Sequence, residues 1–169
     1  IESHIEEAIE KEWIQVYLQT NIRGLSKRVC GAEALSRWID PVYGMISPGE
    51  FIPVLEKKRK IHLLDRYVME TICRGQFIVP ISMNFSRLDF DVPTLLQEME
   101  EIMEKNSLPR NYVHIEITES AVMENEAYMK DTVRELHTLG YKVWMDDFGS
   151  GYSSLNLLKE FEFDTFKID

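Results

Sequence analysis

The sequence predicts an α/β fold of the (β/α) barrel kind, and two observations lead to that prediction. Short runs rich in β-branched and aromatic residues alternate with amphipathic helical stretches along the chain. This alternation favours a parallel sheet, because parallel strands need crossover helices between them. The predicted strands also end on polar or charged residues, and the carboxyl ends of barrel strands converge on one mouth where active sites lie.

Six segments are predicted as strands, because each is a short run that suits a largely buried sheet. They are Ile14–Gln19, Val29–Leu35, Val79–Asn84, Val113–Thr118, Lys142–Asp146 and Phe163–Asp169.

The helical stretches carry their apolar residues at a period near 3.6. One face gathers Leu95, Leu96, Met99, Ile102 and Met103, and a second helix presents Tyr128, Met129, Val133 and Leu136. Gly140 follows the second helix as its stop. Ser47 is predicted to cap another helix, with Pro48 at its first position and Glu50 as the reciprocal partner of a capping box.

Composition and charge limit the classes of ligand that the chain is expected to bind. The chain has 169 residues, of which 44% are hydrophobic and 28% charged, as in one ordinary globular domain. A formal net charge of −10, spread along the chain, argues against binding of a nucleic acid polymer through a broad basic face. A small anionic ligand remains compatible, where metal ions or a few arginines neutralise it. The charged run 56–60 is predicted to be solvated.

Two cysteines and the lack of long apolar runs favour a cytoplasmic protein. Cys30 and Cys73 have no spacing that suggests a zinc site, so we expect reduced thiols. No apolar run approaches the roughly 18 residues that span a bilayer. Because the chain begins at Ile1 without an initiator Met, we expect it to come from a longer parent, and a membrane anchor elsewhere in that parent stays open.

Chemistry is predicted at the carboxyl ends of the strands. Polar and charged residues occur near the ends of successive strands, namely Glu33, Asn84, Glu116, Asp146, Asp147, Lys167 and Asp169. Carboxylates gathered at such density need a cation among them. Oxygen ligands without His or Cys favour a hard ion, Mg²⁺, Mn²⁺ or Ca²⁺, over zinc. The adjacent pair Asp146 and Asp147 favours two ions that share a carboxylate, the clamp that cuts a phosphodiester by in-line attack of water.

These residues belong to motifs that resemble the EAL domain family over essentially the whole chain. The matching motifs, in order, are Gly31-Ala32-Glu33-Ala34-Leu35-Ser36-Arg37-Trp38, Pro48-Gly49-Glu50-Phe51-Ile52, Asn84 with Ser86, Glu116-Ile117-Thr118-Glu119-Ser120, Asp146-Asp147-Phe148-Gly149-Ser150-Gly151-Tyr152-Ser153-Ser154-Leu155 and Lys167-Ile168-Asp169. The resemblance implies a TIM-like (β/α) barrel that hydrolyses cyclic di-GMP to the linear dinucleotide in bacterial second-messenger signalling.

The resemblance also implies a role for each matching residue. Glu33, Asn84, Glu116 and Asp146 would bind a first metal ion, and Asp147 a second, with Asp146 bridging. Lys167 would orient or help activate the attacking water, so that Lys167, Glu33 and Asp147 are the expected catalytic residues. Arg37 would hold a phosphate, and Gln19 and Leu35 would contact the dinucleotide. Glu119 would support the loop Asp147–Ser154. The expected cofactors are two Mg²⁺ or Mn²⁺ ions, with Ca²⁺ inhibitory.

A full barrel of this type takes about 250 residues. We therefore expect residues 1–169 to form a single incomplete barrel domain with about six of eight strands, lacking the last two β/α units. Those units would supply one more metal-binding glutamate and a glutamine that contacts guanine. Open sheet edges invite pairing, so a homodimer is expected. A sensory or GGDEF-type domain is expected upstream in the parent.

Other functions stay open. A catalytically inactive EAL domain could serve as a cyclic di-GMP receptor or as a dimerisation scaffold. A metal-dependent barrel of the enolase kind fits less well, because it uses single carboxylates for one main ion. Taken singly, Glu33 could pair with Arg37, Asn84 could lie in a turn and Asp147 could cap a helix.

Overall fold

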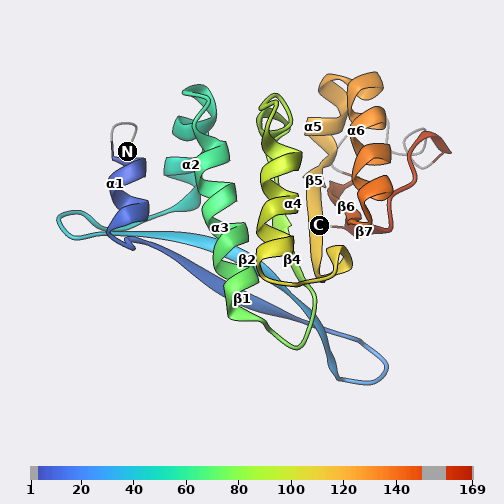
Figure 1. The fold of residues 1–169 in the computed structure, drawn as a ribbon, viewed down its shortest axis with the longest axis horizontal. Coiled ribbons are helices and arrows are strands. Elements are labelled where there is room, and N and C mark those ends of the chain that lie inside the picture. Colours follow the sequence, from blue (N-terminus) through green and yellow to red (C-terminus); the bar gives the residue numbers. More distant parts are fainter. Residues whose placement is uncertain (1–3, 150–158, 169) are drawn as a thin grey trace.

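The computed structural model describes residues 4–149 and 159–168, in which six helices stand in a row along one face of an open sheet (Figure 1). The strands are β1 Ile14–Ile22, β2 Val29–Asp40, β3 Gly44–Ile46, β4 Ile81–Asn84, β5 Val113–Thr118, β6 Lys142–Phe148 and β7 Thr165–Ile168. The α-helices are α1 Ile5–Glu10, α2 Pro48–Lys57, α3 Ile61–Gly75, α4 Leu95–Lys105, α5 Glu119–Glu124 and α6 Glu126–Leu139, and the 3₁₀ turns are η1 Arg87–Asp89 and η2 Arg110–Tyr112.

The sheet confirms the predicted α/β class and contains all six predicted strands. Its order is β1-β2-β4-β5-β6-β7, with β3 paired to β2, and each neighbouring pair from β2–β4 to β6–β7 is parallel. No pairing of β7 with β1 occurs among the described residues, so the sheet is open there. From β2 to β6, the connections between successive parallel strands contain helices, as the alternating pattern predicts.

The expectation of a wholly parallel sheet is wrong at its first two strands. β1 and β2 are antiparallel, because the residues between them are too few for a crossover connection. They form a turn in which the Arg23 N–H donates to the Arg28 carbonyl at 2.9 Å. The short β3, which pairs antiparallel with β2 and lengthens it to Asp40, was not predicted.

Two strand boundaries also differ from the prediction for local reasons. β4 begins at Ile81 rather than Val79, since Pro80 has no N–H to give to the ladder and only its carbonyl accepts, from the Ala32 N–H at 3.1 Å. β7 begins at Thr165 rather than Phe163, and Asp169 lies outside the described residues.

The helix signals in the sequence are confirmed. Ser47 and Glu50 form the capping box of α2, with the Ser47 N–H donating to Glu50 Oε2 at 3.0 Å. Gly140 ends α6 in the left-handed conformation, at φ 99°. Of the apolar face predicted for α4, all residues are buried except Leu96, which is partly buried.

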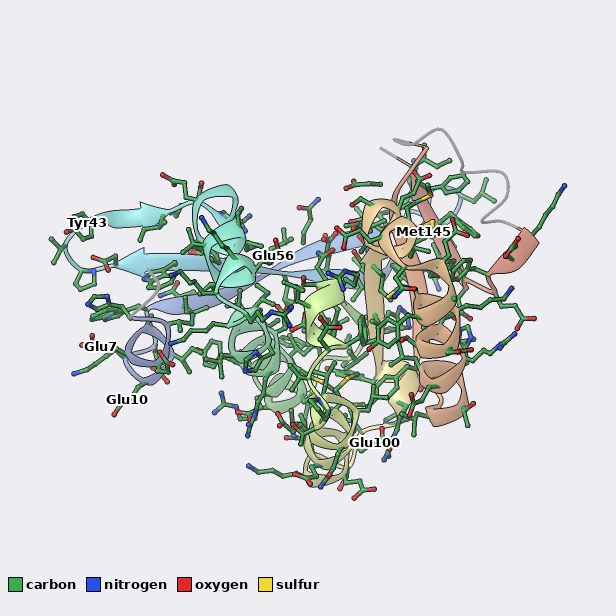
Figure 2. All side chains as sticks on the ribbon, turned by 90° about the horizontal axis from the view of Figure 1, so that it is seen from above. Glu7, Glu10, Tyr43, Glu56, Glu100 and Met145 are labelled. Carbon is green, nitrogen blue, oxygen red and sulfur yellow. The ribbon has the colours of Figure 1, made fainter. Side chains whose placement is uncertain are left out.

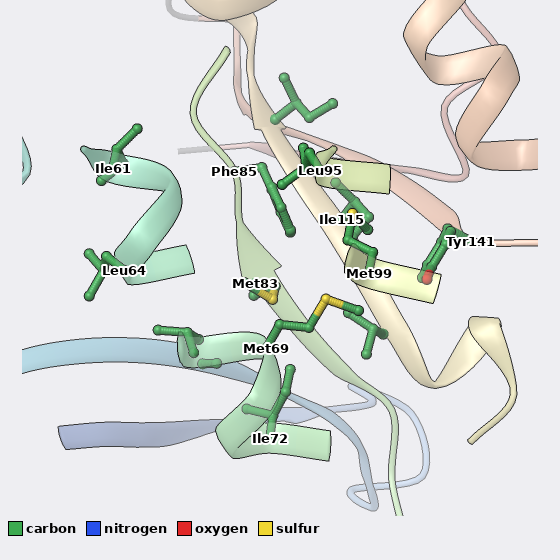
Figure 3. Packing of buried hydrophobic residues seen from close by; sticks show 14 of the residues in the cluster. Ile61, Leu64, Met69, Ile72, Met83, Phe85, Leu95, Met99, Ile115 and Tyr141 are labelled. Carbon is green, nitrogen blue, oxygen red and sulfur yellow. The ribbon is translucent and has the colours of Figure 1, made fainter. Parts of the chain in front are cut away.

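A continuous hydrophobic core fills the space between the helices and the sheet. Figure 3 shows Met69 of α3 and Met99 of α4 packed near Met83 of β4 and Ile115 of β5. Along β4, β5 and β6, every second side chain enters this core, and the residues between them face the other side of the sheet. That second face carries the polar residues of the strands.

Both cysteines are free, as expected: Cys73 is buried, whereas Cys30 is exposed. None of the described helices combines the length and the apolar character that crossing a membrane requires.

Candidate metal centre

The parallel register brings the predicted ligand residues to one end of the sheet. Asn84 lies beside Glu116 on neighbouring strands, and Thr118 lies beside Asp146. Glu33 of β2 lies one strand further, next to Ser82. Because strands of the same direction end at the same edge, side chains far apart in the sequence converge here.

Three carboxylates form the centre of the site. Glu33, Glu116 and Asp146 each offer an oxygen, and these atoms all lie within 4.8 Å of one another. Glu116 is fully buried, and Glu33 and Asp146 are half-buried. Burial of negative charges this close together is unfavourable unless a cation compensates them.

Lys167 supplies one such cation from β7. Its Nζ donates to Glu116 Oε2 at 2.7 Å and to Glu33 Oε2 at 3.0 Å, and lies 3.3 Å from Asp146 Oδ2. Burial alone would lower the pKa of Lys167, but the hydrogen bonds to Glu116 and Glu33 outweigh it and raise the pKa. The ammonium is therefore fully charged at neutral pH.

The remaining carboxylate oxygens fit a hard metal ion. Glu116 Oε1 is buried and, among the described residues, has no hydrogen-bond partner. Burial raises the pKa of Glu116, and the Lys167 hydrogen bond opposes that rise. Asn84 joins the group through its Nδ2, which donates to Glu33 Oε1 at 3.0 Å. An unpartnered buried carboxylate oxygen beside other oxygen donors is the donor set that Mg²⁺, Mn²⁺ or Ca²⁺ prefers.

Asp147 lies next to this cluster but outside it. Its side chain is exposed, and its backbone is left-handed at φ 55°, with the N–H donating to Asp146 Oδ1 at 3.0 Å. The described residues thus bring together the side chains predicted to bind one ion, and the role of Asp147 at a second ion stays a prediction.

Two of the residues expected to contact a ligand line one cavity beside the cluster. Leu35 and Arg37 border a cavity of about 250 Å³ that Asn84 also lines. Arg37 Nη1 donates to the Ser36 carbonyl at 2.8 Å, which leaves other guanidinium donors for a ligand. Gln19 of β1 is exposed and is the cross-strand partner of Glu33, so it lies at the edge of the carboxylate cluster.

Glu119 reaches the residues that follow β6. It is 1% exposed, and its Oε2 accepts the Gly149 N–H at 2.9 Å. This bond holds the start of the segment that Glu119 is expected to support. Residues 150–154 of that segment lie outside the described residues.

Sequence reasoning missed a second acidic group beside the site. Asp65 of α3 and Asp89 of η1 are both buried, and each carboxyl group affects the pKa of the other. Burial raises the pKa of Asp65 well above its ordinary value and that of Asp89 to about 6. The pattern Ser86-x-x-Asp89, a capping box, was a usable signal for Asp89, whereas the amphipathic pattern of α3 gave none for Asp65.

Glu56 also departs from the expectation of a solvated charged run. It is half-buried, and its Oε1 accepts the Ser86 hydroxyl at 2.8 Å. Glu56, Asp65 and Asn84 together line a cavity of about 450 Å³ on this side of the molecule. Figure 2 shows Glu56 on α2.

Comparison with known proteins points to one family. The family model described as "EAL domain" matches residues 2–169. An uncharacterised protein of Synechocystis is 37% identical over 100% of this chain and 25% of its own length. The bifunctional diguanylate cyclase/cyclic di-GMP phosphodiesterase MucR of Pseudomonas aeruginosa is 30% identical over 98% of this chain and 25% of its own length.

A solved structure gives the same answer for the fold. The MucR phosphodiesterase in complex with c-di-GMP superposes with a TM-score of 0.90 at 30% identity, covering 99% of this chain and 71% of that one. Measured against the full-length Synechocystis and MucR proteins rather than this solved structure, the chain spans about a quarter of their length.

Proposed function

Since this chain belongs to the EAL domain family, we propose that it forms part of a domain that hydrolyses cyclic di-GMP to the linear dinucleotide with the help of divalent ions. One observation carries the proposal: Glu33, Glu116 and Asp146 converge from three strands, and a buried oxygen of Glu116 lacks a partner among the described residues. The relatedness to a named cyclic di-GMP phosphodiesterase supports the choice of substrate.

Glu33, Asn84, Glu116 and Asp146 are the proposed ligands of the first ion, and Asp147 contributes to a second. A divalent ion bound there supplies a Lewis acid for a phosphodiester and for water. Mg²⁺ and Mn²⁺ suit the oxygen donors, and we propose that Ca²⁺ inhibits, because it favours larger and more flexible coordination.

The chain's own residues position the reacting groups. Lys167, held charged by Glu33 and Glu116, orients the water that attacks the phosphorus and stabilises negative charge as it develops. Arg37 presents its fork to a phosphate, and Leu35 beside it offers an apolar contact to the dinucleotide. Gln19 adds an amide at the edge of the carboxylate cluster.

The test is cleavage of cyclic di-GMP by the purified intact domain that contains this chain, with Mn²⁺ or Mg²⁺, followed by chromatography of the linear product. Glu116→Gln should reduce the rate at least a hundredfold, about 3 kcal/mol of barrier, while the exposed Glu10→Gln should leave it unchanged. Equal cleavage by wild type and Glu116→Gln would refute the assigned site.

A receptor that binds without cutting is the second candidate, because Asp147 stands apart from the three-carboxylate group. The same experiment separates the two functions. A receptor predicts tight binding of cyclic di-GMP, lost in Arg37→Ala, with no linear product at any metal concentration.

Three further proposals accompany this function. Residues 1–169 belong to a single barrel-type domain and lack its last two β/α units, the domain pairs with a second copy, and it follows a sensory or GGDEF-type domain in a cytoplasmic parent. The bifunctional name of the relative MucR supports the additional domain, and the free thiols of Cys30 and Cys73 suit the cytoplasm.

A further inference from the structure

The turn between β1 and β2 combines exposed apolar and basic side chains. All residues from 22 to 29, here called the β1–β2 tip, are exposed. Leu25 is 99% exposed and Ile22 60%. Three cations, Arg23, Lys27 and Arg28, stand among these apolar residues.

Backbone hydrogen bonds fix the β1–β2 tip in this form. The Arg23 N–H donates to the Arg28 carbonyl at 2.9 Å, and the Lys27 N–H donates to the Arg23 carbonyl at 2.8 Å. Lys27 takes a left-handed conformation at φ 54° to close the turn. In Figure 1 this turn projects away from the row of helices. The side chains are therefore presented outward by an ordered turn.

The positive charge of the β1–β2 tip has no partner within the described chain. No acidic residue occurs between Glu12 and Glu33. Among the described residues, none of the tip's three cations makes an ion pair. Several basic residues elsewhere are paired, as Arg110 is with Glu100 at 2.6 Å. The β1–β2 tip is thus a concentrated positive site on a chain whose net charge is −10.

We propose that the β1–β2 tip docks on the surface of an anionic lipid bilayer. Leu25, Ile22 and Val29 would enter the boundary between headgroups and acyl chains, and the three cations would contact the anionic headgroups. A turn of this size is smaller than the 20–30 residues that a stable protein interface uses on each side. A nucleic acid would need a broader basic face and would leave Leu25 without a role.

The position of the β1–β2 tip suits this docking. β2 begins at Val29, at the tip, and runs toward Glu33 and the carboxyl ends where the metal centre lies. Contact through the tip therefore holds the opposite end of the parallel strands away from the bilayer. The metal centre stays open to a ligand in water.

Sedimentation of the full chain with vesicles tests the proposal. We expect binding to phosphatidylglycerol vesicles, little binding to phosphatidylcholine vesicles, and weakening as salt is raised. The variant Arg23→Ser/Lys27→Asn/Arg28→Ser should lower the partition coefficient about a hundredfold. Leu25→Ser should lower it about tenfold. Thermal melting confirms that each variant is folded.

Two matched controls distinguish the contribution of the β1–β2 tip to vesicle binding from that of net charge and exposed apolar surface in general. Lys11→Ser/Lys57→Ser/Lys105→Ser removes the same charge from scattered exposed sites, and Val42→Ser removes an exposed apolar residue from the β2–β3 turn, where Figure 2 labels Tyr43. Both should bind vesicles like wild type. Equal loss in the tip variants and the controls overturns the proposal. A wild-type chain that does not bind phosphatidylglycerol vesicles also overturns the proposal. The same holds if the β1–β2 tip binds single-stranded RNA but not these vesicles.

Discussion

At the scale of single residues, Lys167 decides the electrostatics of the site. Its ammonium contacts oxygens of three carboxylates, and it is the cation that balances them in the described structure. It uses the Oε2 atoms of Glu33 and Glu116 and leaves Glu116 Oε1 without a partner among the described residues. Lysine and a metal ion can thus share the same carboxylates through different oxygens.

Lys167→Met should therefore destabilise the metal-free protein by about 2 kcal/mol, because three carboxylates then lie together without a cation. The rise in melting temperature on adding Mn²⁺ should be larger than in wild type, since the ion relieves more repulsion. Differential scanning calorimetry with and without Mn²⁺ measures both effects. Lys105→Met, at an exposed position, is the control. An unchanged metal-free melting temperature would contradict this role.

Asp147 combines a proposed ligand role with an unfavourable backbone conformation at φ 55°. Asparagine adopts this conformation readily and alanine does not. Asp147→Asn should keep wild-type stability, whereas Asp147→Ala should lose about 1 kcal/mol in urea unfolding. Both should lose cleavage if the carboxylate binds an ion. Full activity in Asp147→Asn would remove Asp147 from the ligand set.

The buried pair Asp65 and Asp89 predicts a pH effect on stability. Both pKa values are raised in the folded protein, that of Asp89 from 3.8 to about 6. A raised carboxyl pKa means that the folded state holds the proton more tightly, so its stabilisation is complete below about pH 4 and is lost as pH rises through about 6.

Asp65→Asn should flatten this decline, because the amide donates to Asp89 without needing a shared proton. Urea unfolding at pH 4, 5, 6 and 7 would show the free energy of unfolding falling less in the variant than in wild type. The exposed Asp131→Asn is the control. A decline of equal size in Asp65→Asn would show that other groups cause it.

The carboxylate cluster was easier to predict from the sequence than the residues around it. Glu33, Glu116 and Asp146 stood out because a carboxylate in an otherwise apolar strand is anomalous. Asp65 gave no such signal, since a polar residue is ordinary in an amphipathic helix, and its burial arises only when η1 packs against α3. Burial by tertiary packing is not visible in local periodicity.

At the scale of elements, the boundaries that were predictable are those marked by a local sequence pattern. β5 was predicted at its full extent, Val113–Thr118, because its apolar run alternates with polar residues up to a helix cap at Thr118. The antiparallel β1–β2 hairpin was misjudged, although Gly24 and the short connection were present in the sequence. β3 is too short for any periodic signal.

Helix α6 depends on the stop that the sequence predicted. Gly140 has φ 99°, and its N–H donates to carbonyls of the last turn. Gly140→Ala should destabilise the protein by about 1 kcal/mol, because a left-handed alanine is strained while the nearest side-chain atom is at an ordinary distance. Thermal unfolding measures the loss. Gly24→Ala, in open space and without a positive φ, should have a smaller effect.

At the scale of the whole molecule, the metal centre joins strands that are distant in the sequence. Its proposed ligands and Lys167 come from β2, β4, β5, β6 and β7. The ends of these strands are held together by ladder hydrogen bonds and by the charges of the cluster. An ion bound to four strands at once should stabilise their carboxyl ends as one unit.

Hydrogen exchange can test whether the strands respond together. Adding Mn²⁺ should slow amide exchange in β2, β4, β5 and β6 by a similar factor, while α1 and β3, which contribute no proposed ligand, should exchange as before. In Glu116→Gln the slowing should disappear from all four strands, because the shared ion is lost with one ligand. Slowing confined to the end of β6, around Asp146 and Asp147, would mean that the ion binds there alone and that the four strands do not share it.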